Sequence, residues 1–355
     1  MRNSLKLILL GSLLSSVALG LEVDKAAGHF NIKYDYYGKS ESYYEPSITS
    51  STNNGNEGSR LELSGKMSTF KDQWFEYRVR EYQNLQNKNS SNSKRSVGND
   101  TRVIYYFKYD DLYEGKIGNA TRLEYRSLYY SNLEQVSVSQ VFDFKKVLPK
   151  GTNNFKITSL KLIPGYEYRF KGPETDYYVN RLKLDLDYRF ILPYEFQLYG
   201  TLYLSQNYYS DEARIARKTT TKNSTTTTKT TTELVSSELF QATLEMYLRR
   251  TWNIFKYKDY SVDFQFIGGL DSLGYSGYNS YNTVLSTNET TLMTGKYKAS
   301  IYAFPHIGVN YKPTKNLEVF GNVGAEYRNW EYQNFQNMRD WEWQARAVIG
   351  MNRKF

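Results

Sequence analysis

The last fifteen residues of the chain, Trp341-Glu-Trp-Gln-Ala-Arg-Ala-Val-Ile-Gly-Met-Asn-Arg-Lys-Phe355, alternate between two kinds of side chain. Every second residue from Trp341 is mostly apolar, and the residues between are mostly polar or charged. A period of two indicates a β-strand with different surroundings on its two faces. A terminal strand leaves an unpaired edge, which pairing with the first strand would remove. This stretch therefore predicts a closed β-barrel.

The same alternation recurs along the chain and is clearest in Tyr178–Phe190, where leucines and aromatics alternate with charged residues. Segments of about ten residues or more suit tilted strands that cross a membrane. Pro164 cannot donate to a strand ladder, so it predicts a bulge or a change of phase. About fourteen strands are predicted, with sixteen as the alternative count: Gly28–Tyr37, Arg60–Thr69, Trp74–Tyr82, Asp100–Tyr109, Ile117–Tyr130, Leu133–Phe144, Phe155–Phe170, Tyr178–Phe190, Glu195–Asn207, Ser236–Arg249, Lys258–Leu270, Lys296–Tyr311, Leu317–Arg328 and Asp340–Phe355.

The connections between these segments alternate between short and long. Outer-membrane barrels have an even number of antiparallel strands, short periplasmic turns and longer external loops. An even number also puts both termini on one side, here the periplasm. We therefore predict an all-β fold, a transmembrane antiparallel up-and-down β-barrel. It would occupy residues 21–355 as one domain in the outer membrane of a diderm bacterium.

Residues 1–20 have the pattern of an export signal peptide. Arg2 and Lys6 form a positive start, Leu7–Leu19 is a short apolar core, and Ala18-Leu19-Gly20 provides small residues for cleavage. Removing this segment lowers the net charge of +9 by two. A mild basic excess alone fits DNA binding or an anion-attracting pore. Export argues against a nucleic-acid partner.

The composition is typical of a membrane barrel, in which alternate residues alone need be apolar. The mean hydropathy is −0.66, yet aromatics reach 16% and Tyr supplies 35 residues. Cys is absent and two His are present, so we expect no disulfide, no thiolate or metal site and no cofactor. Aromatics near the segment ends predict two interfacial girdles: Tyr36–Tyr37, Trp74, Tyr129–Tyr130, Tyr177–Tyr178, Tyr208–Tyr209, Trp330 and Trp341.

Charged residues lie on the face opposite the apolar residues in most segments. If the apolar face meets outer-membrane lipid, the charged face borders a lumen, and a lipid-facing Arg would cost about 2–4 kcal/mol. A barrel of fourteen strands is too wide for side chains to fill. We expect a water-filled pore for small hydrophilic solutes and ions, weakly anion-preferring or unselective. The predicted pore-lining residues are Arg60, Glu62, Glu76, Arg78, Arg80, Arg102, Arg122, Glu124, Arg126, Arg181, Lys183, Asp185, Asp187, Arg189 and Arg346.

Four short motifs resemble the FomA-type major outer-membrane porins of fusobacteria: His29–Glu41, Gly58–Leu63, Phe75–Arg80 and Thr121–Arg126. The spacing of the resemblance covers most of the mature chain. It implies a β-barrel porin, a homotrimer, that allows non-specific diffusion through the outer membrane. The Thr- and Lys-rich run Lys218–Thr232 and the short segment before the first strand depart from that pattern.

Three alternatives stay open. A barrel enzyme needs a His with a carboxylate or Ser near the external rim, and His306 lies on the polar face of its segment, but we expect no enzyme. A surface adhesin would bind partners through the loops Gly38–Gly58, Tyr208–Val235 and Asp271–Gly295; we read the Thr- and Lys-rich run of the second as mobile and exposed. A sugar-specific channel would use an aromatic track inside the lumen, formed by Tyr106, Tyr199, Tyr203, Tyr247 and Tyr302.

Overall fold

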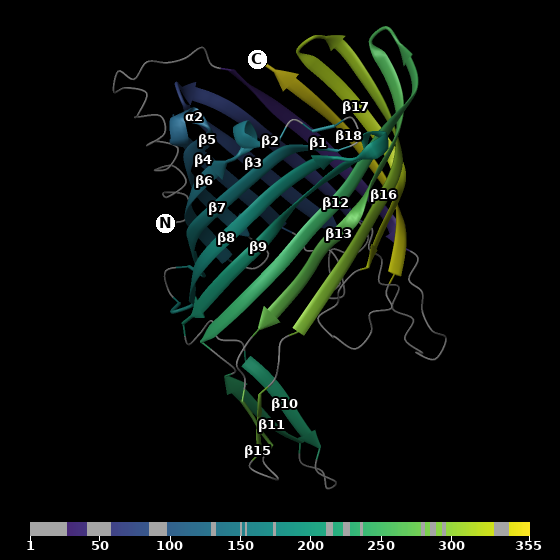
Figure 1. Cartoon of the computed structure of the whole chain (residues 1–355). Coiled ribbons are helices and arrows are strands. Elements are labelled where there is room, and N and C mark those ends of the chain that lie inside the picture. Colours follow the sequence, from purple (N-terminus) through teal and green to yellow (C-terminus); the bar gives the residue numbers. More distant parts are fainter. Residues whose placement is uncertain are drawn as a thin grey trace.

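The structure is a computed structural model, and it shows a closed barrel of fourteen strands (Figure 1). Each strand pairs antiparallel with its neighbours, so the predicted fold and strand number are confirmed. No helix among the described residues is long and apolar enough to cross a membrane. The structure describes residues 27–40, 58–84, 98–128, 133–149, 151–152, 155–172, 175–210, 216–222, 228–234, 237–277, 281–284, 289–292, 296–329 and 341–355.

The barrel follows chain order, and two small hairpins are inserted outside it. The barrel strands are β1 (Ala27–Ser40), β2 (Gly58–Phe70), β3 (Gln73–Asn84), β4 (Gly98–Asp111), β5 (Ile117–Leu128), β6 (Leu133–Asp143), β7 (Lys156–Phe170), β8 (Tyr178–Ile191), β9 (Gln197–Tyr209), β12 (Glu238–Tyr257), β13 (Tyr260–Gly277), β16 (Lys296–Thr314), β17 (Leu317–Asn329) and β18 (Trp341–Lys354). The hairpins are β10 (Ala216–Lys222) with β11 (Thr228–Leu234), and β14 (Tyr281–Val284) with β15 (Glu289–Leu292). Short helical turns are α2 (Leu112–Gly115), η3 (Lys145–Val147) and η4 (Pro193–Glu195).

The ring closes where the first strand pairs with the last. β1 runs antiparallel to β18, with Asp35 opposite Val348. At the end of this seam the Gly28 N–H donates to the Phe355 carbonyl at 3.1 Å, and the Phe355 N–H donates back at 3.0 Å. Because each of these two strands also pairs with its other neighbour, neither leaves an open edge. The closure predicted from the terminal strand is confirmed.

Side chains alternate between an apolar exterior and a polar interior. On the outer face, Val323 is 67% exposed and Ile349 is 62% exposed. On the inner face, Glu326 is 2% exposed and Gln344 is 3% exposed. Each pair of neighbouring strands keeps this phase, because directly opposite residues point to the same side of a sheet. This arrangement is the opposite of a soluble protein, which has an apolar interior and a polar surface.

The two ends of the barrel differ. One end carries the short turns, and the C-terminal Phe355 lies there beside Gly28 (Figure 1). The long connections leave the other end, beyond which the β10–β11 hairpin and β15 lie (Figure 1). In an outer-membrane barrel the short turns face the periplasm and the long connections face outward.

Several details differ from the sequence prediction. The segment 250–257 joins two predicted strands, but β12 continues through it to Tyr257, with a register shift between Asn253 and Phe255 that changes the phase of the pattern. Pro164 was predicted to mark a bulge or phase change, but its strand keeps one register with β6 across it, and the bulge of β7 lies between Ile157 and Ser159. The loop Tyr208–Val235 contains the β10–β11 hairpin.

We expect Val323→Arg to lower the free energy of unfolding by about 2–4 kcal/mol, because the charge would enter the lipid-facing band. Val323→Leu is the matched control, since it keeps the position apolar. Urea titration of protein folded into lipid vesicles measures the free energy of unfolding of both variants. Equal stability of the two variants would contradict the assignment of the outer face.

Candidate functional site: the charged and aromatic inner wall

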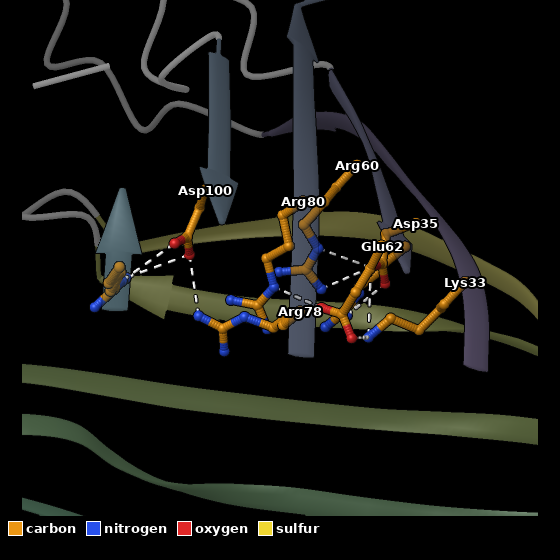
Figure 2. Close-up of polar contacts among 9 residues, drawn as sticks. Lys33, Asp35, Arg60, Glu62, Arg78, Arg80 and Asp100 are labelled. Atoms are coloured by element: carbon orange, nitrogen blue, oxygen red, sulfur yellow. Dashed lines mark hydrogen bonds and ion pairs between the residues drawn. The ribbon is translucent and has the colours of Figure 1, made fainter. Parts of the chain in front are cut away.

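Asp35 lies at the centre of an ion-pair cluster that spans the seam between the chain ends. Its side chain is 0% exposed. The Arg60 Nη2 atom of β2 donates to Asp35 Oδ2 at 2.6 Å, and the Arg346 Nη2 atom of β18 donates to Asp35 Oδ1 at 2.7 Å (Figure 2 shows the Asp35–Arg60 side). Arg346 also donates to Glu326 at 2.7 Å. Three strands, β18, β1 and β2, are thereby joined through one carboxylate.

The next carboxylates along the wall are shared in the same way (Figure 2). Glu62 accepts a hydrogen bond from Arg80 Nε at 2.5 Å and lies 3.5 Å from the Lys33 ammonium nitrogen. Asp100 of β4 accepts from Arg78 on β3 at 3.0 Å and from Arg126 on β5 at 3.1 Å. These pairs connect neighbouring strands, as directly opposite or diagonal residues do in a sheet.

The pattern continues into β4–β8. Glu124 accepts from Arg102 at 2.6 Å and also from Arg122. A second group is centred on Glu167 of β7, whose cations are Arg169 at 2.6 Å, Arg181 at 3.4 Å and Lys183 at 3.6 Å. Two or more cations therefore surround each of these carboxylates, so this wall carries an excess of positive charge. A buried carboxylate is tolerated only because the surrounding cations compensate it.

The structure places all fifteen residues predicted to line the pore on the inward face. Eleven form ion pairs in the clusters just described: Arg60, Glu62, Arg78, Arg80, Arg102, Arg122, Glu124, Arg126, Arg181, Lys183 and Arg346. Glu76 lies 3.7 Å from Lys66. Asp185, Asp187 and Arg189 share the inward parity of β8.

The prediction missed further inward charged residues, among them Lys33, Asp35, Asp100, Glu167 and Arg169. The alternation of β1 had already put Lys33 and Asp35 on the polar face, so parity alone would have found them. Asp100 is the first residue of a predicted strand, where it is hard to assign the face on which a side chain lies. Glu167 follows Pro164, where a change of phase was expected but does not occur.

Tyrosines rather than ion pairs dominate the opposite part of the wall. Tyr199 on β9 stacks on Tyr247 on β12 with ring centroids 5.6 Å apart. Tyr247 meets Tyr302 on β16 edge to face at 6.3 Å. The inner wall thus has a charged side, formed by β1–β8 and β18, and an aromatic side, formed by β9, β12 and β16.

Trp74 was predicted to belong to an interfacial girdle, but it has the inward parity of β3. It lies opposite Tyr106 on β4 and stacks on that ring at 4.8 Å. The ammonium of Lys66 lies 4.5 Å from the Trp74 ring centroid. Among the other predicted girdle residues, Tyr129–Tyr130 and Trp330 lie outside the described residues.

His306 also faces inward and is 3% exposed. Its Nδ1 atom lies 3.0 Å from the Phe304 carbonyl oxygen, and its ring stacks on the Phe304 ring at 4.3 Å. No carboxylate is hydrogen-bonded to it in the described part of the chain. Within the same residues, no group of three His, Asp or Glu is placed to hold a metal ion.

Comparison with known proteins finds no matching family model and no matching curated protein. Among solved structures, the chain is similar to a bacterial polysaccharide outer membrane secretin, with 11% identity over 92% of this chain and 98% of the other, at a TM-score of 0.38. An anion-selective porin from Comamonas acidovorans shares 9% identity over 93% and 100%, at a TM-score of 0.35. OmpT, an outer membrane protein of Vibrio cholerae, shares 8% over 93% and 97%, also at 0.35. Likenesses this distant assign no function.

The strand pairing and the contrast between the two faces of the barrel show the class of protein without those likenesses. A closed antiparallel barrel leaves no backbone edge in a bilayer, and its exterior is apolar. Its strands are 11–20 residues long, enough to cross the hydrocarbon layer at a tilt. This chain is an outer-membrane β-barrel with a porin-like inner wall.

We expect Asp35→Ala to destabilise the barrel by about 3–5 kcal/mol, because Arg60 would keep a buried charge without its carboxylate and Arg346 would keep only Glu326. Asp187→Ala is the control: Asp187 faces the same interior but forms no ion pair within the described residues, and its loss should cost about 1 kcal/mol or less. Urea unfolding followed by tryptophan fluorescence compares the two. Equal losses would show that the seam cluster contributes no special stability.

Proposed function

We propose that this chain is a porin that lets small hydrophilic solutes and ions cross the outer membrane through its lumen, without enzymatic activity. The observation that carries the proposal is the combination of a closed fourteen-stranded ring with an ionic inner wall. Eight strands give a barrel that side chains fill, whereas fourteen enclose a wider space. Charged groups in that space are most stable where water reaches them.

The charge distribution supports weak anion preference. Each carboxylate of the Glu124 and Glu167 groups is surrounded by two or more cations. Fixed charges on a pore wall favour the counter-ion of the majority sign. The acidic residues reduce the net field, so the preference is modest.

The motifs at His29–Glu41, Gly58–Leu63, Phe75–Arg80 and Thr121–Arg126 support a closer relationship, to the FomA-type porins of fusobacteria. With that relationship we propose a homotrimer. Apart from Glu41, which lies outside the described residues, the motifs lie on β1, β2, β3 and β5, which form one continuous part of the barrel wall together with β4.

In planar bilayers under a KCl gradient, the purified protein should produce discrete conductance steps and a reversal potential of weakly anion-selective sign. Lys66→Glu should move the reversal potential toward cation selectivity, because Lys66 points into the lumen beside Trp74 and Glu76. Lys258→Glu makes the same charge change in the β12–β13 turn and should leave selectivity nearly unchanged.

Strong cation selectivity of the wild type would reject the proposed anion preference. Absence of conductance from correctly folded, inserted protein would reject the pore. Equal effects of the two charge reversals would place Lys66 outside the conducting path.

A second function, binding of a surface partner, is favoured by one observation. The β10–β11 hairpin stands beyond the long-loop end of the barrel, separate from the barrel sheet (Figure 1). Such hairpins on a rigid scaffold are common sites of recognition.

Deleting residues 218–232 should leave conductance and barrel stability intact, because the β10–β11 pair shares no ladder with the barrel strands. Loss of cell–cell adhesion in the deletion strain, with porin abundance unchanged, would support the second function. Unchanged adhesion in the deletion strain would contradict the second function.

A further inference from the structure

The lumen wall between β7, β8, β9 and β12 contains a pocket of about 430 Å³. Its volume lies within the range of small-molecule sites. Arg189 and Tyr199, which line it, are each two residues from the short-turn end of their strands. The pocket therefore lies in the half of the lumen toward the short turns.

An aromatic platform forms one side of this pocket. The rings of Tyr199 and Tyr247 stack at 5.6 Å with 27° between their planes. On the neighbouring strand β13 the residue opposite both Tyr247 and Tyr302 is Gly269. Because Gly269 has no side chain to separate them, Tyr247 and Tyr302 meet across β13 at 6.3 Å. The platform thus extends as a row of three rings along the wall.

Two charged groups of the pocket, Arg189 and Asp187, keep hydrogen-bonding capacity that the clusters across the lumen have already used. Across the lumen, Arg60 and Arg102 are bonded to buried carboxylates. Arg189 instead lies with its guanidinium carbon 5.8 Å from the Tyr199 ring centroid and forms no ion pair within the described residues. Asp187 accepts one hydrogen bond, from the Thr201 hydroxyl at 2.8 Å, and forms no ion pair there either. Donor and acceptor groups therefore flank a partly exposed aromatic surface.

The charges of the pocket balance. Lys161 and Arg189 supply two positive groups, and Asp187 and Glu245 supply two negative groups. A balanced site gives no net attraction to an ion of either sign. A ligand that fits it is electrically neutral, has a flat apolar face for the rings, and carries hydroxyls that both donate to carboxylates and accept from a guanidinium.

We propose that this pocket is a binding subsite for neutral sugar rings. The C–H face of a sugar ring packs on Tyr199 and Tyr247, and ring hydroxyls donate to Asp187 and accept from Arg189. The inference rests on the proposed pore, because a solute reaches the subsite only through the lumen. It adds a preference for one solute class to an otherwise non-specific path.

Maltotriose, added to the protein in planar bilayers, should interrupt the ionic current in a concentration-dependent way. Tyr199→Ala and Tyr247→Ala should each weaken maltotriose association about ten-fold, since loss of one stacking surface is worth about 1.4 kcal/mol. Tyr199→Phe keeps the ring and should bind within about two-fold of the wild type. Arg189→Gln should also weaken maltotriose association, because the ring hydroxyls would lose a charged donor.

A parallel titration of tyrosine and tryptophan fluorescence in detergent micelles measures maltotriose binding without requiring conductance. Binding there in the absence of any channel current would overturn the pore and keep the subsite. Normal current with no interruption, or interruption equal in wild type and Tyr199→Ala, would overturn the subsite and keep the pore. Stronger interruption by trigalacturonate than by maltotriose would overturn the assignment to neutral sugars.

Discussion

Satisfaction of backbone hydrogen bonds in a medium without water is the constraint on which this structure depends. A peptide N–H or C=O left unpaired in hydrocarbon costs several kcal/mol, so a sheet that spans a bilayer must have no edge. Here the chain meets that demand by pairing β1 with β18. The apolar exterior, the ionic interior and the width of the lumen are consequences of closing this particular number of strands.

Closure also determines where charge can lie. Since side chains alternate, a strand that presents leucine and valine to lipid must present its other residues inward, and a slip by one residue would invert both faces. The inward residues then meet across the ladders as cation–carboxylate clusters. The cluster at Asp35 joins the two ends of the chain, because Asp35 and Arg346 are separated by 311 residues in sequence and 2.7 Å in space. The seam is thus held by backbone pairing and by a buried ion-pair network together.

Much of the fold was predictable from the sequence, because period-two alternation is a local signal. In β8 it predicted both the strand and the face of each residue from Arg181 to Arg189. It failed where the phase changes: the bulge between Asn253 and Phe255 interrupts the alternation, and the end of β12 fell outside the predicted strand. The alternation along each strand predicted which residues face inward. It did not predict which residues they contact on neighbouring strands. The Arg–carboxylate pairs and the tyrosine row depend on the register between strands, and the Tyr247–Tyr302 contact depends on a glycine in a third strand.

One face of each barrel strand meets lipid, and the other face meets water. The natural chain contains no cysteine, so single-cysteine variants can report it without background. Cysteine placed in turn at positions 182–187 of β8, in protein folded into vesicles, should react with a membrane-impermeant thiol reagent at 183, 185 and 187 and resist it at 182, 184 and 186. Uniform protection at all six positions would mean that no water column fills the barrel, and uniform reaction would mean that its outer face is not in lipid.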